Sequence, residues 1–351
     1  MPRIVSVGTA VPPYEVAQDT ARQFAQEMFS HAFRDIDRLL PVFDHAKIGT
    51  RYFSVPFDWF KREHSLREKN DTYIEVACDL STEAIENCLA HAGLTAQQID
   101  HLIFVSTTGI STPSIDAYLA NRLNMAPHLK RTPIWGLGCA GGAVGLSRAY
   151  DYVKAFPQDR VLLVAVELCS LTFQRSDLSK SNLIATSLFA DGAAAALVSG
   201  DDVQSTSTNE PSILATMSTL WKETEDVMGW ALKDNGLNVI FSKHIPTIVQ
   251  TLMRPNMEQF LATEQLTIEQ IDRFITHPGG MKVIKAYEDA LHLPPDQTAP
   301  AKDILARYGN MSSASVLFVL EQIMQEARPG EYGIMTALGP GFSSEQLLLK
   351  W

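Results

Sequence analysis

The chain has 351 residues, of which 46% are hydrophobic, so it can bury one large core or two fused ones. Its formal net charge is −11 and its lysines and arginines are dispersed, which disfavours nucleic acid as a partner, because DNA binding requires a clustered basic face. No apolar run approaches the ~20 residues needed to span a bilayer, and residues 1–16 predict a strand and a turn rather than a signal peptide. We therefore expect a soluble, cytoplasmic protein.

The predicted elements alternate between strand and helix along the chain. Residues 71–93 have the apolar spacing of a helix that ends at Gly93, and the small, apolar residues 140–149 predict a buried helix. Strands are expected at residues 101–105, 161–166, 193–198, 211–221 and 332–337. This alternation predicts mixed sheets that are covered by helices on both faces.

The chain repeats itself at an offset of about 171 residues. Residues 138–143 (GCAGGA) align with residues 309–314 (GNMSSA), and each segment opens a small-residue turn that leads into an apolar helix. The strand that ends at Ser106 lies 33 residues before Cys139, and the strand that ends at His277 lies 33 residues before Asn310. We expect two stacked α/β halves, 1–205 and 206–351, separated by the polar stretch 200–211.

The repeat brings three chemically different side chains toward one centre. Cys139 and Asn310 occupy equivalent positions, and His277 occupies the position equivalent to Ser106. Taken alone, His277 fits a loop contact equally well, and Asn310 fits a turn or a helix cap. A thiol, an imidazole and a carboxamide at a shared centre indicate nucleophilic catalysis. Because Cys139 begins a helix, we expect helix-terminal N–H groups and the helix dipole to lower its pKa.

The other cysteines, Cys78, Cys88 and Cys169, are expected to be small buried hydrophobic side chains. The sequence has no metal-type CxxC pattern and no cysteine after residue 169. We therefore expect neither a disulfide framework nor a metal site.

Five motifs occur in order: GCAGG (138–142), FADGAAAAL (189–197), HPGG (277–280), YGNMSSAS (308–315) and GPGFSSE (339–345). Together they resemble type III polyketide synthases, the chalcone-synthase-like branch of the thiolase fold, from about residue 4 to the end of the chain. WGLGCAGG, DVMGW and SKSNLIATSLF are most similar to bacterial members that make alkylpyrones or alkylresorcinols. The resemblance implies a five-layered αβαβα thiolase fold, an acyltransferase and a homodimer.

By this resemblance, Cys139 is the nucleophile that carries the acyl group, and His277 and Asn310 are its partners. The implied reaction loads a fatty acyl-CoA on Cys139, extends it with malonyl-CoA by decarboxylative Claisen condensation, and releases an alkylpyrone or an alkylresorcinol. Neither a metal nor a redox cofactor is implied, because the substrates are CoA thioesters.

The resemblance also assigns residues to the substrate cavity. Phe189 matches a gate phenylalanine, and the other matched cavity positions are Thr172, Ser312, Gly339, Pro340 and Gly341. Val239 aligns with a second gate phenylalanine, and its smaller side chain favours a long aliphatic starter over a rigid aromatic one.

The cations that would bind the CoA phosphates are less completely matched. Three early basic positions of plant relatives align with Arg38, Pro41 and His45, so only Arg38 keeps the charge. Lys47, Arg51 and Lys282 are candidates to supply the missing charge, and each is equally consistent with a solvated surface cation.

Three other classes compete with this interpretation. A thiolase is disfavoured because its second active cysteine belongs in the C-terminal half, where this chain has none. An initiating-type ketoacyl-ACP synthase uses the same three side chains, takes an acyl carrier protein and stops after one condensation; HPGG and GPGFSSE disfavour it. A silent acyl-binding subunit predicts the loss of at least one of the three side chains.

Overall fold

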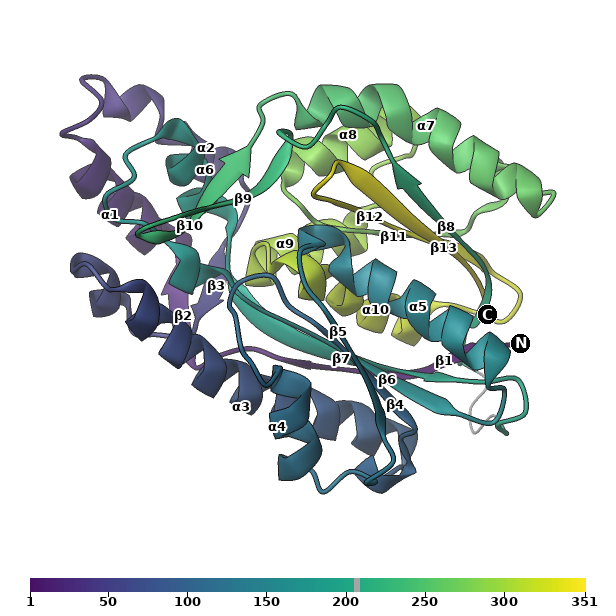
Figure 1. Cartoon of the computed structure of the whole chain (residues 1–351). Helices are drawn as coiled ribbons and strands as arrows, with labels where there is room; N and C mark the ends of the chain where they lie inside the picture. Colours follow the sequence, from purple (N-terminus) through teal and green to yellow (C-terminus); the bar gives the residue numbers. More distant parts are fainter. Residues whose placement is uncertain (205–208) are drawn as a thin grey trace.

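The structure is a computed structural model that describes residues 1–204 and 209–351 (Figure 1). The expected boundary between residues 205 and 206 lies outside the described residues. No helix in the described part of the chain is long and apolar enough to cross a membrane.

The N-terminal half contributes five strands to the large sheet, in the order β1-β7-β6-β4-β5. They are β1 (Arg3–Ala10), β7 (Asp191–Ser199), β6 (Arg160–Leu168), β4 (His101–Val105) and β5 (Lys130–Ile134). β4 is parallel to both of its neighbours, whereas β7 is antiparallel to both. All nine residues of β7 are buried, as expected for a strand whose two faces are both covered.

The C-terminal half repeats this pattern in the order β8-β13-β12-β11. Its strands are β8 (Ser212–Leu220), β13 (Ser343–Lys350), β12 (Tyr332–Gly339) and β11 (Arg273–Thr276). β11 is parallel to β12 just as β4 is parallel to β6, and the next two pairs are antiparallel in both halves. Pairing of Arg3 on β1 with Ser212 on β8 joins the halves into a nine-stranded sheet.

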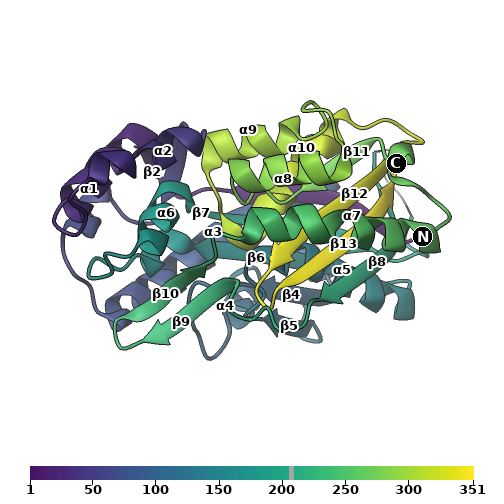
Figure 2. The same cartoon turned by 90° about the horizontal axis from the view of Figure 1, so that it is seen from above.

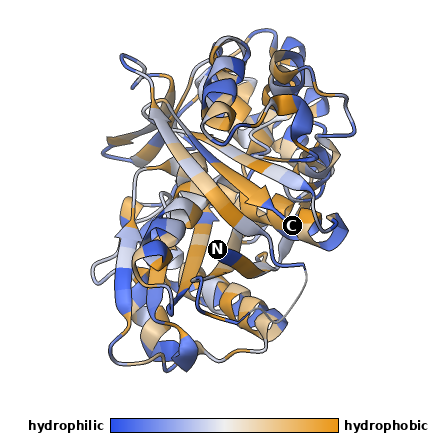
Figure 3. Cartoon of the chain, turned by 90° about the vertical axis from the view of Figure 1, so that its right-hand side faces the viewer, coloured by the Kyte–Doolittle hydropathy of each residue, from blue (hydrophilic) through white to orange (hydrophobic). Residues whose placement is uncertain are grey.

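Helices form the remaining three layers (Figures 1 and 2). α5 (Gly141–Ala155) and α10 (Ser315–Glu326) lie between the two half-sheets. α3 (Leu66–Ala92) and α4 (Ile115–Arg122) cover the outer face of the N-terminal half, and α7 (Ile245–Thr263) and α8 (Met281–Leu291) cover that of the C-terminal half. Hydrophobic residues concentrate on the central strands (Figure 3). The predicted five-layered thiolase fold is confirmed.

The remaining elements surround the site. They are β2 (Tyr14–Ala17), α1 (Gln18–Phe29), α2 (Pro41–His45), β3 (Thr50–Phe53), α6 (Lys180–Leu188), β9 (Met228–Lys233), β10 (Gly236–Phe241) and α9 (Ala299–Tyr308). All of them except α9 gather at one end of the layers, on the left in Figure 1.

The two central helices approach each other closely where the halves meet. A Cβ atom on Gly142 of α5 would lie only 2.2 Å from the backbone oxygen of Ser313, in the short 3-10 turn Ser312–Ala314 that precedes α10. Only glycine fits such a contact without moving the backbone. This contact places the turns that carry Cys139 and Asn310 side by side.

Candidate active site

Cys139 lies in a 3-10 turn, Gly138–Ala140, between β5 and α5. Gly138 has a φ of 46°, and a Cβ atom there would lie 2.8 Å from Cδ of Pro340, so the turn requires glycine. The Cys139 thiol donates to Oγ of Ser312 at 3.5 Å. The Cys139 turn of one half, which carries the predicted nucleophile, therefore contacts the equivalent turn of the other half, as the sequence repeat predicts.

Asn310 is held by its backbone and by its side chain. Its backbone N–H donates to the Leu188 oxygen at 2.9 Å, and its backbone oxygen accepts from the Ala190 N–H at 2.9 Å. These two hydrogen bonds form an isolated β-bridge between Asn310 and Phe189. Its Oδ1 accepts from the Ser312 N–H at 2.8 Å, and its Nδ2 donates to the Gly279 oxygen at 3.2 Å. The second amide hydrogen of Asn310 remains for the Cys139 sulfur, to which this side chain is hydrogen-bonded.

His277 follows β11 and is buried, with 4% of its surface exposed. Its backbone N–H donates to the Thr336 oxygen at 2.9 Å, while its two ring nitrogens have no hydrogen-bond partner among the described residues. A Cβ atom on Gly279 would lie 3.4 Å from Nε2, so any larger residue at position 279 would pack directly against the imidazole. Because Gly279 also accepts the Asn310 amide, the HPGG loop connects His277 to Asn310.

The electrostatics of the site differ from the prediction. Burial raises the pKa of Cys139 to about 12; hydrogen bonds from Ser312 and Asn310 oppose this increase, and the charge of Glu167 adds to it. Burial also lowers the pKa of His277 to about 3. The predicted lowering of the Cys139 pKa is therefore wrong for the unliganded chain. Packing removes the water that would solvate a thiolate, and the neutral imidazole supplies no positive charge.

A buried carboxylate, Glu167, connects the two halves behind the nucleophile. Its Oε2 accepts from the Thr107 N–H at 3.0 Å, and its Oε1 accepts from the Ser313 hydroxyl at 2.7 Å. Burial raises its pKa to about 7. Sequence reasoning missed this residue, although a single acidic residue near the end of the apolar strand VLLVAVEL is a usable signal.

An inner cavity of about 60 Å³ has aromatic side chains on much of its wall, beside polar ones such as Arg51, Gln174 and Asn182. Three predicted substrate residues, Phe189, Thr172 and Val239, lie on this wall. It also contains Phe24, Phe53, Phe57, Phe60, Phe173 and Trp230. Trp230 pairs with Val239 across the β9–β10 hairpin, and its ring centroid lies 6.1 Å from that of Phe189. The sequence analysis missed Trp230, which occupies space beside the small Val239 side chain.

Family comparisons identify the chain. A family model described as the N-terminal domain of chalcone and stilbene synthases matches residues 2–202, and the corresponding C-terminal domain model matches residues 212–351. The chain belongs to the chalcone and stilbene synthase family and is a type III polyketide synthase. Enzymes of this kind are acyltransferases, as the sequence analysis expects.

Individual relatives cover nearly the whole synthase. It is 47% identical to a putative chalcone synthase of Bacillus subtilis, over 99% of the chain and 98% of that protein. It is 39% identical to 1,3,6,8-tetrahydroxynaphthalene synthase of Streptomyces peucetius, over 99% and 93%. It is 30% identical to the alpha-pyrone synthesis polyketide synthase-like Pks18 of Mycobacterium tuberculosis, over 98% and 90%. The solved 1,3,6,8-tetrahydroxynaphthalene synthase of Streptomyces coelicolor superposes with a TM-score of 0.94 at 27% identity, covering 99% of both chains.

The other predicted cavity residues of the synthase lie beside the nucleophile turn rather than on the inner cavity. Ser312 accepts the Cys139 hydrogen bond. Pro340 contacts Gly138, and a Cβ atom on Gly339 would lie 2.5 Å from the Leu137 oxygen. Gly341 follows in the same loop.

The wall of a second cavity, of about 150 Å³, includes Ile184 and Leu188 of α6. The inner cavity of the synthase has other residues of the same segment on its wall, Ala185, Thr186 and Phe189, so α6 contributes to both cavities. The basic residues on the wall of the second cavity are His45, Lys243 and Lys282. Sequence reasoning predicted His45 and Lys282 and missed Lys243.

The structure separates the remaining predicted CoA ligands from this second cavity. Arg38 and Lys47 are exposed but lie outside its wall, and Arg38 forms an ion pair with Asp35 at 2.7 Å. Arg51 is only 1% exposed and lies on the wall of the inner cavity. Burial excludes Arg51 from contact with a phosphate at the protein surface, so that interpretation of Arg51 is wrong.

Proposed function

We propose that this synthase condenses a long-chain fatty acyl-CoA with malonyl-CoA on Cys139 and releases a cyclised alkylpyrone or alkylresorcinol. The observation that carries the proposal is the meeting of the Cys139 and Asn310 turns, together with the bridge from Asn310 to Phe189, which lies on the wall of a partly aromatic cavity. The name of the mycobacterial relative supports a pyrone.

Loading of the acyl group begins with a neutral Cys139 thiol and a neutral His277 imidazole. As Sγ of Cys139 attacks the thioester carbonyl, the His277 imidazole accepts the thiol proton. The carbonyl carbon then breaks its bond to the CoA sulfur, and the imidazolium returns the proton to that sulfur. The products are an acyl group on Cys139 and free CoA.

Extension requires stabilisation of negative charge on oxygen. When malonyl-CoA loses CO2, the electron pair of the broken C–C bond forms an enolate, whose oxygen accepts hydrogen bonds from His277 Nε2–H and the remaining Asn310 N–H. Such donors contribute about 3–4 kcal/mol each. The enolate carbon attacks the Cys139 thioester, the sulfur leaves and regains a proton, and the lengthened chain on CoA returns to Cys139. These steps use only protein groups, and we propose that no metal or redox cofactor takes part.

The inner cavity supports an aliphatic starter. The volume of this cavity, about 60 Å³, is below the ~300 Å³ of typical ligand pockets, so a long acyl chain must displace side chains on its wall such as Phe189 or Trp230. The small Val239 side chain leaves room for this movement.

The second cavity supports CoA binding at its opening. His45, Lys243 and Lys282 are exposed there and can pair with phosphate, while Val42 and Phe241 offer apolar contact. We propose that the pantetheine arm passes Phe189 from this side.

We further propose a cytoplasmic homodimer. Two large apolar side chains, Trp135 at 57% and Ile110 at 53% exposure, are candidates for the contact between subunits. They belong to adjoining segments, because Trp135 Nε1 donates to the Gly109 oxygen at 3.2 Å. The four free cysteines are compatible with a reducing compartment.

Product analysis tests the proposed reaction. Short, long and aromatic acyl-CoAs are each incubated with malonyl-CoA and the purified enzyme, beside Cys139→Ala, and the products are identified by mass spectrometry. Alkylpyrones or alkylresorcinols from long-chain starters, absent with the variant, support the proposal. Formation of 1,3,6,8-tetrahydroxynaphthalene, the product in the name of the Streptomyces peucetius relative, would replace it.

A further inference from the structure

Arg51 is the largest of the fully buried side chains. Burial lowers its pKa to about 10, although the charge of Asp191 opposes this effect. No carboxylate forms an ion pair with Arg51 among the described residues. Burying a guanidinium is costly, so the contacts that it makes indicate what it does.

The guanidinium binds the end of α6. Nη1 of Arg51 donates to the Thr186 oxygen at 2.7 Å and to the Phe189 oxygen at 2.9 Å. The last carbonyl groups of a helix have no partner within the helix, and a positive charge is favourable beside them. Nε and Nη2 have no hydrogen-bond partner among the described residues. All hydrogen bonds of this guanidinium therefore go to the turn that contains Phe189.

The aliphatic part of Arg51 contacts the other side of the same bridge. A Cβ atom on Gly309 would lie 2.8 Å from Cγ and 2.9 Å from Cδ of Arg51. Gly309 directly precedes Asn310, whose backbone pairs with Leu188 and Ala190. One side chain thus contacts both strands of the Phe189–Asn310 bridge.

We propose that Arg51 is a positioning residue that holds the gate side chain Phe189 and the Asn310 amide in register. The inference rests on the proposed function of these two residues. In this role Arg51 acts through the backbone of the bridge and not through contact with the reacting atoms.

This role predicts an unequal effect on the two half-reactions. Loading needs Cys139 and His277, whereas extension also needs the Asn310 amide in place. Loss of the Arg51 contacts should therefore slow extension more than loading. A purely structural role would lower both rates together, in proportion to the amount of folded protein.

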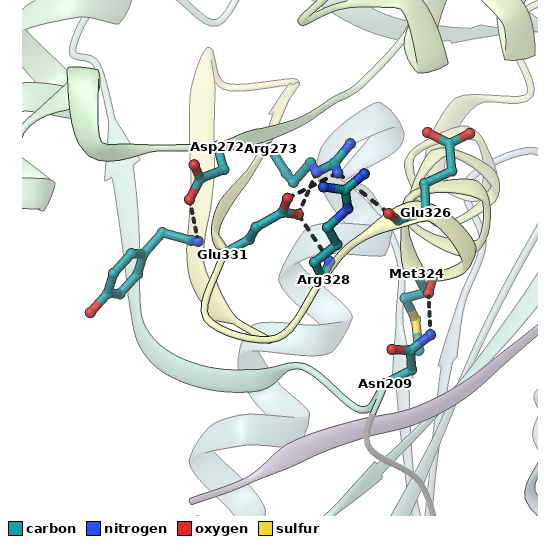
Figure 4. A network of polar contacts seen from close by, with 8 residues as sticks. Asn209, Asp272, Arg273, Met324, Glu326, Arg328 and Glu331 are labelled. Atoms are coloured by element: carbon teal, nitrogen blue, oxygen red, sulfur yellow. Dashed lines mark hydrogen bonds and ion pairs between the residues drawn. The ribbon is translucent and has the colours of Figure 1, made fainter.

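The experiment compares Arg51→Met and Arg51→Lys with the wild-type enzyme. Loading is followed as the acyl adduct on Cys139 by intact mass, and extension as CO2 release from malonyl-CoA. Arg273→Met is the matched control, because Arg273, like Arg51, donates to a helix-end carbonyl, that of Glu326, and it is further paired with the Glu331 carboxylate (Figure 4). Arg273 begins β11, whereas His277 follows the other end of that strand. Hydrogen exchange of the Ala190 and Asn310 amides is measured on the same samples.

We expect Arg51→Met to lower extension at least tenfold more than loading, Arg51→Lys to restore part of the loss, and the control to leave the ratio unchanged. Exchange at Ala190 and Asn310 should accelerate in Arg51→Met. Equal losses in both half-reactions, or unchanged exchange at these amides, would overturn the inference. A wild-type enzyme that neither loads nor extends overturns the proposed function instead, and the exchange measurement still decides whether Arg51 holds the bridge.

Discussion

At the scale of single residues, the reactivity of Cys139 depends on how far packing excludes water from its thiol. The thiol and the His277 imidazole are both neutral, because burial disfavours both charged forms. Proton transfer between them is then coupled to attack on the substrate. This differs from a cysteine that is stored as a thiolate next to an imidazolium.

The pH dependence of Cys139 alkylation tests this view. Because burial raises the Cys139 pKa to about 12, the thiolate fraction should rise tenfold with each pH unit below that value. We expect the rate of iodoacetamide modification of the substrate-free enzyme, followed by intact mass, to increase steadily from pH 6 to pH 9. A rate that is already constant from pH 6 upward would instead indicate a stored thiolate.

Sequence reasoning found the site at this scale wherever the repeat or a motif marked it. Cys139, His277 and Asn310 stand at corresponding corners of the two halves, so their meeting could be predicted. The Cys139 pKa could not, because it depends on how much water the surrounding packing excludes. Arg51 resembled a surface cation for the same reason, since a short basic segment does not show which of its charges is buried.

At the scale of elements, the β9–β10 hairpin forms one wall of the inner cavity. Trp230 and Val239 face each other across this hairpin and both contact the cavity. The hairpin was not predicted as a unit, because its strands have short and irregular alternation and gain their stability from packing against the cavity.

Substitutions on this hairpin should change the preferred starter in opposite directions. Val239→Phe narrows the passage and should lower turnover of long-chain acyl-CoAs relative to short ones, whereas Trp230→Ala should favour longer starters. Competition between two acyl-CoAs, read out by product mass, measures the ratio. If Val239→Phe left long-chain turnover unchanged, the preference for a long aliphatic starter would lose its support.

The close contact between α5 and the turn before α10 should contribute to the stability of the fold and to the geometry of the site. Gly142→Ala would place a methyl group 2.2 Å from the Ser313 backbone oxygen. Overpacking of this kind typically costs about 1–3 kcal/mol. Urea unfolding should show that loss, together with reduced activity, while Gly49→Ala, whose nearest contact is an ordinary 3.5 Å, serves as the control. Equal stability of the two variants would contradict the tight-contact account.

At the scale of the whole molecule, the duplicated half explains both the fold and the position of the site. Thr95 and Thr267 each begin a capping box before the corresponding strands β4 and β11. The equivalent turns then meet where the two halves join. One turn carries the thiol of Cys139 and the other carries the amide of Asn310. The order of the layers could be predicted from this repeat. The joining of the two half-sheets through β1 and β8 could not be predicted, because a single cross-strand pair leaves no periodic pattern in the sequence.

The most direct test of the account is intact-mass spectrometry of the enzyme after brief exposure to a long-chain acyl-CoA, followed by peptide mapping. We predict a mass increase of one acyl group, localised to Cys139, that disappears when malonyl-CoA is added and does not form in Cys139→Ala. An adduct on another residue, or none while products still form, would contradict the assignment of Cys139 as the acyl carrier.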